Sequence, residues 1–467
     1  MASRTMHPDA ASTVPDDGGG IMSATLRATT VGVLALVSLH AFEALALTTV
    51  MPTIARELDG ASLYAMAFTA TLASGLVSIV WSGNLADRRG PRPPLLLGLA
   101  LFAAGLVVAG LAPSMGVLVA ARVVQGLGAG MTSTALYVLV TRVYPQRLHT
   151  AILAGFSAAW VVPSIAGPFV AGLITQTIGW RWVFGLALVV LVVAAVLLGR
   201  ILAGLRQEVV EVPWRTRSIA ASVALAVAVL ALNGAADRLD PVGITVGVLA
   251  LVVVALTLLP LTPRGTLRAA RGLPSDIALR ALAFAAFSGA EVYLPRLLTE
   301  RDGLSPSLAG VALTITGVTW FVGSWVQGRW DRRFEIGRTA AVSLAAITLS
   351  LLGLAVSVAL GAPTWVVIAL FPAVGLGIGT LYPRVTAQAL ARSAPGEQGF
   401  VSSALQIGDS SGAATAIAVS AIVFAGAGSA VPGAYAVVFA VMAVPALIGW
   451  ALAHRVRGGT APSPDLG

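Results

Sequence analysis

Residues 83–92 read Gly-Asn-Leu-Ala-Asp-Arg-Arg-Gly-Pro-Arg, and residues 328–333 read Gly-Arg-Trp-Asp-Arg-Arg. In each stretch an aspartate is followed by two arginines, and the aspartates, Asp87 and Asp331, are 244 residues apart. Each stretch joins two long apolar segments of a chain that is otherwise poor in charge. The recurrence indicates a membrane protein built of two related halves, an organisation typical of transporters.

The composition supports a membrane location for the whole chain. Of its 467 residues 57% are hydrophobic and 10% are charged, whereas a soluble domain carries about 25% charged residues. The mean hydropathy is +0.90, and apolar runs of about 20 residues, enough to cross a ~30 Å hydrocarbon layer as a helix, recur to the end of the chain. The strict alternation of barrel strands is absent. We therefore predict an all-α integral membrane protein.

The charge and cysteine content narrow the class further. The formal net charge is +9, and all 29 basic residues are arginine. These arginines fall in loops on one side, so their charge does not indicate nucleic-acid binding. The absence of cysteine excludes disulfide and thiol chemistry. The preference for arginine and alanine suggests a bacterium with a high-GC genome.

The apolar runs predict fourteen spans joined by short connections. The residues 1–26 before them are polar and are expected to form a disordered cytoplasmic tail. They are not a signal peptide, because the apolar run that follows is too long. The predicted spans are 29–54, 63–85, 93–112, 115–140, 149–174, 180–203, 217–236, 241–262, 277–298, 308–329, 338–360, 364–385, 399–425 and 432–454.

The distribution of arginine sets the expected orientation. With the N-terminus inside, 23 arginines fall in inside segments, among them Arg280, and 5 fall in outside loops. Arg122 is then the only basic residue placed deep in a span. An even number of spans puts both termini, including the tail 456–467, on the cytoplasmic side of the plasma membrane. Twelve spans remain an alternative if residues 217–262 form a hairpin that does not cross fully.

The repeat extends well beyond the opening stretches. Pro52 and Gly60 recur as Pro295 and Gly303, both at an offset of 243 residues. The first six spans therefore match the last six. We predict a six-helix bundle over 27–204, two inserted linker helices over 205–272, and a second six-helix bundle over 273–455.

Three acidic residues lie inside apolar spans and are candidates for proton coupling: Glu43, Glu291 and Asp409. An ionised side chain at mid-bilayer costs ~2.5–3.5 kcal/mol on insertion scales, so such residues persist where they meet a cavity or a partner. Arg122 is the obvious partner of Glu43 if spans 1 and 4 touch. While Arg122 is paired with Glu43, the Glu43 carboxylate is favoured in its ionised form. When the pair separates, the protonated form is favoured, so opening of the protein would be coupled to proton exchange. The alternatives are a static ion pair and, for each acid, a protonated packing contact.

The opening stretches are predicted to form gating loops. Gly83 and Gly90 would permit tight turns, and Asp87 would accept hydrogen bonds from arginines or from the N-terminus of a neighbouring helix. Alternatively, the arginines only fix orientation and touch anionic lipid. The other residues assigned to these loops are Arg88, Arg89, Asp331, Arg332 and Arg333.

Proline and glycine cluster in span 5, at Pro163, Gly167, Pro168 and Gly172. Proline bends a helix and glycine allows close packing, so a hinge is predicted here, with simple helix packing as the alternative. Several other side chains are candidates for the wall of a substrate cavity, although aromatic residues also serve as core or interfacial residues. These candidates are Phe42, Gln125, Tyr137, Trp160, Phe287, Tyr293, Trp320 and Gln406.

No motif for an enzyme or a metal centre is found. The chain has no phosphate-binding loop and no His-Glu-x-x-His, and its four histidines lack the spacing of metal ligands. His40 precedes Glu43 by three residues and is either a packed histidine or part of a proton relay. We expect no cofactor other than a proton gradient. The expected partners are a small-molecule substrate, protons and membrane lipid, and the expected state is a monomer.

The chain resembles the major facilitator superfamily, and within it the fourteen-helix drug:proton antiporters. Gly83-xxx-Asp87-Arg88-Arg89-Gly90 is similar to the signature between spans 2 and 3, and Arg122-xx-Gln125-Gly126 to that of span 4. Ala166-Gly167-Pro168-xxx-Gly172 resembles much of the antiporter signature of span 5, with Pro163 where the family often has glycine. Glu43 stands where the family usually has aspartate.

The resemblance implies a fold of two pseudo-symmetric six-helix bundles plus two inserted helices. It also implies efflux of amphipathic or cationic drugs in exchange for protons by alternating access, with consequent antibiotic resistance. Uptake or facilitated transport of a metabolite, and export of a lipid, remain alternatives. At the positions that match Gly83 and Gly90, the second opening stretch has no glycine. We therefore expect the first half to hold the main gate.

Overall fold

The computed structural model describes residues 19–60, 63–205, 213–236, 240–304, 306–330, 335–394, 396–426 and 433–457. Over these residues the chain forms α-helices and short 3-10 turns, and no strand, so the all-α prediction is confirmed. Three members of the second gating stretch, Asp331, Arg332 and Arg333, lie outside the described residues, as does most of the predicted N-terminal tail.

The helices are long and mostly apolar, as the ~20-residue runs predict. In chain order they are α1 (Arg27–Glu57), α2 (Tyr64–Arg89), α3 (Arg92–Gly110), α4 (Met115–Val143), α5 (His149–Thr177), α6 (Arg181–Gly204), α7 (Thr216–Ala236), α8 (Pro241–Leu261), α9 (Leu273–Glu291), α10 (Tyr293–Glu300), α11 (Pro306–Trp330), α12 (Ile336–Ala359), α13 (Thr364–Leu370), α14 (Pro372–Ala391), α15 (Gln398–Gly426) and α16 (Gly433–Leu452).

Twelve spans among the described helices are long and apolar enough to cross a membrane, when α9–α10 and α13–α14 count as one span each. Helix α7 has a shorter apolar stretch, Thr216–Leu232, and the 25-residue α11 is not among the twelve. At about 1.5 Å per residue, α7 extends about 31 Å and α11 about 37 Å. The structure therefore shows a chain with many membrane spans, and the number fourteen stays a prediction.

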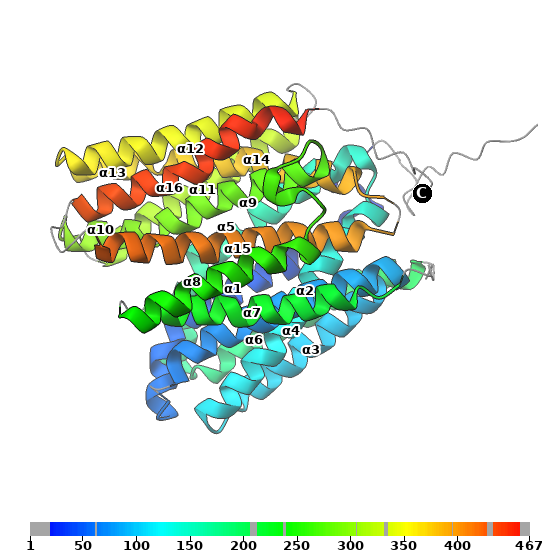
Figure 1. Cartoon of the computed structure of the whole chain (residues 1–467). Coiled ribbons are helices and arrows are strands. Elements are labelled where there is room, and N and C mark those ends of the chain that lie inside the picture. Colours follow the sequence, from blue (N-terminus) through cyan, green and yellow to red (C-terminus); the bar gives the residue numbers. More distant parts are fainter. Residues whose placement is uncertain are drawn as a thin grey trace, which may run out of the picture.

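The buried apolar side chains gather in separate clusters. One joins residues of α1–α6 between Leu26 and Leu205, and another joins residues of α9–α16 between Leu279 and Val456. In Figure 1 α2, α3, α4 and α6 of the first group lie below α12, α13, α14 and α16 of the second. The domain boundaries at residues 204 and 272 stay a prediction.

The inserted helices α7 and α8 lie in front of the seam between the two groups in Figure 1. Helix α7 packs against α8, against α2 of the first group and against α15 of the second. A third apolar cluster contains Leu76 and Val80 of α2, Leu225 of α7, Val254 of α8 and Ile407 of α15. The insertion is therefore in contact with both halves.

The opening stretch corrects one expectation. Residues 83–89 are not a loop but the last turns of α2, so Gly83 is helical. A Cβ atom on Gly83 would lie 2.6 Å from the carbonyl oxygen of Gly399, which shows that glycine serves a close approach of α2 to α15. The turn itself is made by Gly90, whose φ of 76° favours glycine, as expected. Below, the end of the bundle where α2 ends and α15 begins is called the arginine-rich end.

Candidate functional site

Glu43 of α1 and Arg122 of α4 form an ion pair inside the first half. Their side chains are 11% and 4% exposed. The guanidinium also donates from Nε to the carbonyl oxygen of Ala67 at 3.1 Å and from Nη1 to Oε1 of Gln125 at 3.0 Å. Spans 1 and 4 therefore touch, which is the condition on which the pairing of Glu43 with Arg122 depended. Burying two charges costs several kcal/mol per ion, which this network offsets by pairing and hydrogen bonding.

The surroundings of Glu43 are apolar apart from its partner. Glu43 and Phe42 line a small pocket whose far wall is made by Val183 and Phe184 of α6. His40, one helical turn before Glu43, lies 3.2 Å from Oγ1 of Thr132 on α4. Its ring packs edge-on against Phe102. These contacts match the packed histidine, and among the described residues His40 forms no hydrogen bond with Glu43.

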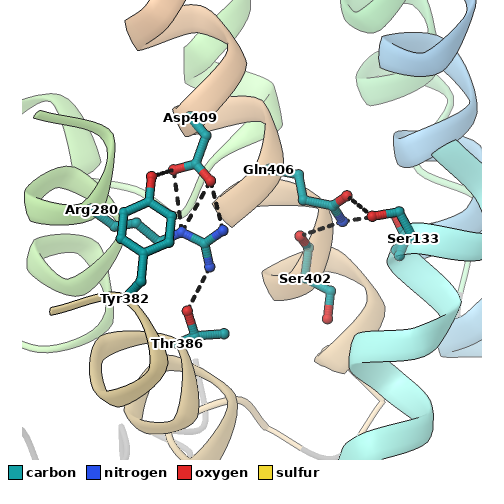
Figure 2. Close-up of polar contacts among 8 residues, drawn as sticks. Ser133, Arg280, Tyr382, Thr386, Ser402, Gln406 and Asp409 are labelled. Atoms are coloured by element: carbon teal, nitrogen blue, oxygen red, sulfur yellow. Dashed lines mark hydrogen bonds and ion pairs between the residues drawn. The ribbon is translucent and has the colours of Figure 1, made fainter. Parts of the chain in front are cut away.

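A second buried ion pair lies in the other half and is shown in Figure 2. Arg280 of α9 contacts Asp409 of α15 through Nη2 to Oδ2 at 2.6 Å and through Nε at 3.1–3.2 Å. Arg280 also donates to Thr386 Oγ1 at 2.6 Å, and the Tyr382 hydroxyl donates to Asp409 Oδ1 at 3.1 Å. The side chains of Arg280 and Asp409 are 4% and 13% exposed.

This pair corrects two expectations. Arg122 is not the only arginine deep in the helical bundle, because Arg280 is buried in α9 rather than exposed in an inside loop. Asp409, a candidate for proton coupling for which no partner was predicted, has a counter-charge in Arg280. The ring of Tyr382 lies 4.5 Å from the Arg280 guanidinium, measured to its centroid. The cluster therefore joins α9, α14 and α15 through charge and aromatic contacts.

Glu291 differs from the other two acids. It is the last residue of α9, and Tyr293 starts α10 immediately after the break. Within the described part of the chain, no hydrogen bond or ion pair to its side chain is recorded, in contrast to Glu43 and Asp409. A carboxyl at a helix break without a counter-charge in the described part of the chain stays a candidate for binding a ligand or a proton.

The arginine-rich end is closed by Asp87. Its Oδ1 accepts from the Gly399 N–H at 2.6 Å and its Oδ2 from the Phe400 N–H at 3.0 Å. Both donors belong to the first turn of α15, where unsatisfied N–H groups and the helix dipole favour a negative charge. The predicted contact of Asp87 with a neighbouring helix N-terminus is confirmed. Arg88 lies over the ring of Trp214, and Arg89 is exposed.

Further polar contacts cross the seam towards the centre of the molecule. Gln406 of α15 accepts from the Ser133 hydroxyl at 2.6 Å and donates to Thr134 Oγ1 at 3.0 Å (Figure 2). Nearer the arginine-rich end, the Thr141 hydroxyl donates to Gln398 at 3.1 Å. These contacts hold α4 against α15, so opening this end requires all of them to break.

The predicted cavity residues fall into different environments. Phe287 and Trp320 pack together with ring centroids 5.3 Å apart, and Trp320 also meets Tyr382 at 5.6 Å. The buried indole N–H of Trp320 has no hydrogen-bond partner in the described part of the chain. The remaining candidates are Tyr137, which packs on Phe156, Tyr293, which packs on Phe424 and Tyr435, Trp160, which is 47% exposed, and Gln125, which is buried beside Arg122.

Span 5 is a single continuous helix, α5, with Pro163 and Pro168 inside it. A Cβ on Gly167 would meet Phe42 of α1 at 3.5 Å, and one on Gly172 would meet Thr49 at 3.9 Å. These distances fit close packing of α5 on α1. The hinge stays a prediction. Among the described residues no group of three or more potential metal-ligating side chains is found.

The sequence also matches a known family. The model of the Major Facilitator Superfamily matches residues 33–417. The chain belongs to the major facilitator superfamily. It is a membrane transporter, as the two-half architecture suggests.

Two relatives are similar over most of the chain. A "Probable multidrug-efflux transporter" of Mycobacterium tuberculosis is 27% identical over 392 residues, which cover 79% of this chain and 82% of the relative. The "Methylenomycin A resistance protein" of Bacillus subtilis is 26% identical over 464 residues, covering 96% and 95% of the two chains.

Solved structures share the fold at low sequence identity. The human organic anion transporter MFSD10 aligns with a TM-score of 0.64 at 18% identity, over 91% of this chain and 98% of that chain. A bacterial homologue of the iron transporter ferroportin in an outward-facing state aligns with a TM-score of 0.67 at 12% identity, over 91% and 98%.

Proposed function

We propose that this transporter exports amphipathic or cationic small molecules in exchange for protons, by alternating access across the plasma membrane of a bacterium. The observation that carries the proposal is the buried pair of Glu43 and Arg122, which joins α1 to α4 inside the first half. The efflux and resistance names of the relatives support the outward direction.

The pair supplies a mechanism for coupling. Arg122 remains charged, whereas the Glu43 carboxyl exists in two protonation states. A movement of α1 relative to α4 that separates the two would leave Glu43 in the apolar pocket against α6. There the neutral, protonated carboxyl is the less costly form. Proton uptake would thus accompany one direction of the movement and proton release the other.

The orientation follows from charge. Arg88, Arg89 and Arg142 stand at the arginine-rich end, and positively charged loops favour the cytoplasmic side. With that end inside, the contacts of Asp87 close the cytoplasmic side of the pathway. The described conformation would then receive protons from outside and release substrate there.

The binding region for substrate is assigned to the second half. Phe287, Trp320 and Tyr382 supply an aromatic surface, and the unpartnered indole N–H of Trp320 could donate to a polar group of the substrate. Because Asp409 is neutralised by Arg280, Glu291 is the acid best suited to a cationic group. Glu291→Gln should therefore raise KM for a cationic dye about tenfold and leave a neutral substrate nearly unaffected.

Uphill dye efflux from cells that lack their own pumps tests the coupling. Glu43→Gln should reduce efflux against a gradient at least tenfold, because glutamine cannot exchange a proton. Glu335→Gln is the matched control, since Glu335 is half-exposed and lies outside the spans. Both proteins must reach the membrane in equal amounts. Uphill efflux by Glu43→Gln equal to that of the control would refute the assignment.

A further inference from the structure

The residues just before α7 contact both halves of the transporter at the arginine-rich end. The backbone N–H of Arg215 donates to Oδ1 of Asn84 on α2 at 2.9 Å. The side chain of the same residue reaches the other half, where Nη2 lies 3.0 Å from Oε1 of Glu397. Its guanidinium carbon lies 3.9 Å from the centroid of the Phe400 ring at the start of α15. One arginine thus bridges α2 and α15.

These contacts surround the Asp87 closure. Asn84 precedes Asp87 on α2 by three residues, and the N–H of Phe400 donates one of the two hydrogen bonds that Asp87 accepts. Trp214, next to Arg215, lies 5.0 Å from the guanidinium of Arg88. A small pocket between α2, α7 and α15 is lined by Asn84, Asp87, Arg215 and Phe400 together.

The inserted helices are anchored well enough to hold this bridge. Leu225 and Val229 of α7 belong to the same buried cluster as Leu76 of α2 and Ile407 of α15. The Ser218 hydroxyl, one turn into α7, donates to the carbonyl oxygen of Pro260 on α8 at 2.8 Å. The bridge therefore starts from a hairpin that is packed against both halves.

We propose that Arg215 is a positioning residue for closure of the arginine-rich end. Through it the inserted helices α7 and α8 stabilise the conformation in which Asp87 contacts α15. Opening this end must separate α2 from α15. Arg215 then keeps its backbone bond to Asn84 but loses Glu397 and Phe400, so its side chain favours the closed conformation. The inference needs the chain to be a transporter and is independent of proton coupling.

Thiol labelling measures this equilibrium directly, because the chain has no cysteine. Ser133→Cys places one thiol at the seam, beside Gln406. A membrane-impermeant maleimide, added to vesicles with the arginine-rich end outward, reaches this thiol only when that end opens. No substrate and no pH gradient are present, so failure of the proposed coupling would not alter the result.

Arg215→Ala in the Ser133→Cys background should speed labelling roughly tenfold, because a cation–π contact and a half-exposed ion pair are lost. Glu397→Gln should give a smaller increase, since Glu397 is half-exposed and Arg215 keeps its contact with Phe400. Arg215→Lys should fall between wild type and alanine, because lysine keeps the charge but not the planar stacking on Phe400.

Arg217→Ala is the matched control, because Arg217 is exposed at the start of α7 and the substitution removes the same charge. It should label at the wild-type rate. The charge exchange Arg215→Glu with Glu397→Arg should restore slow labelling in part. If Arg215→Ala labels no faster than Arg217→Ala, or if Glu397→Gln slows labelling, the positioning role is overturned.

Discussion

At the scale of single residues, the molecule depends on two buried ion pairs that serve different helices. Arg280→Met would leave Asp409 charged and unpaired, which costs about 3–5 kcal/mol for a buried pair. The double variant Arg280→Met with Asp409→Leu removes both charges, so it should recover most of that loss. Thermal unfolding of the purified protein in detergent measures the difference. A double variant as unstable as the single one would mean that the pair itself stabilises the fold.

Arg122 is expected to act by its geometry as well as by its charge. Arg122→Lys keeps the charge but cannot reach Glu43, Gln125 and the carbonyl oxygen of Ala67 together. Transport should fall at least tenfold while the amount of protein in the membrane is unchanged. Arg181→Lys is a suitable control, because Arg181 is 46% exposed. Equal activity of the two variants would contradict the geometric role.

One ion pair is predictable from the sequence and the other is not, for a physical reason. Glu43 and Arg122 are isolated charges in long apolar segments, so their pairing is the simplest way to satisfy both. Arg280 lies near the start of its predicted span, 277–298, and close to the loop arginines Arg268 and Arg271. Position alone therefore suggested an exposed residue, and only the packing of α15 against α9 reveals the partnership with Asp409.

At the scale of helices, glycine controls how closely neighbours approach. A Cβ on Gly126 of α4 would clash with the carbonyl oxygen of Thr71 on α2, whereas nothing lies within 4 Å of a Cβ on Gly199 of α6. Gly126→Ala should therefore destabilise the protein by about 1–3 kcal/mol through overpacking. Gly199→Ala should stabilise it by about 0.5–1 kcal/mol, because alanine favours the helix. Thermal unfolding of the two variants decides, and equal shifts would contradict the packing argument.

Hydropathy predicted most helices well and their ends less well. The second span was predicted to end at residue 85, but α2 continues to Arg89. Asp87, Arg88 and Arg89 lower the hydropathy without breaking the helix, which ends only where Gly90 adopts a positive φ. The break after Glu291 was not predicted either, because apolar residues continue on both sides of it.

At the scale of the whole molecule, transport requires the arginine-rich end to open and close. Thr141 and Gln398 contact each other across the seam at 3.1 Å. Changing both to cysteine and joining them with a short bifunctional thiol reagent should abolish transport, because α4 and α15 can no longer separate. Reduction of the link should restore activity, and each single cysteine is a control. Full transport by the linked protein would show that this seam does not open.

Long-range contacts set the limit of prediction at this scale. The sequence predicted that Asp87 accepts from arginines or from a helix N-terminus, and its partner is the N-terminus of α15, 312 residues away at Gly399. Charge and glycine content point to the type of contact. The choice among several helix starts depends on the relative placement of the halves, which no local pattern encodes.

Proton flux coupled to dye movement tests the central claim most directly. The purified transporter is placed in vesicles with the arginine-rich end outward and an acidic lumen, and a lipophilic cationic dye is added outside. The proposal predicts accumulation of dye in the lumen, an accompanying rise in luminal pH, and loss of both in Glu43→Gln. Dye movement without proton flux, or dye and protons moving in the same direction, would contradict proton-coupled export.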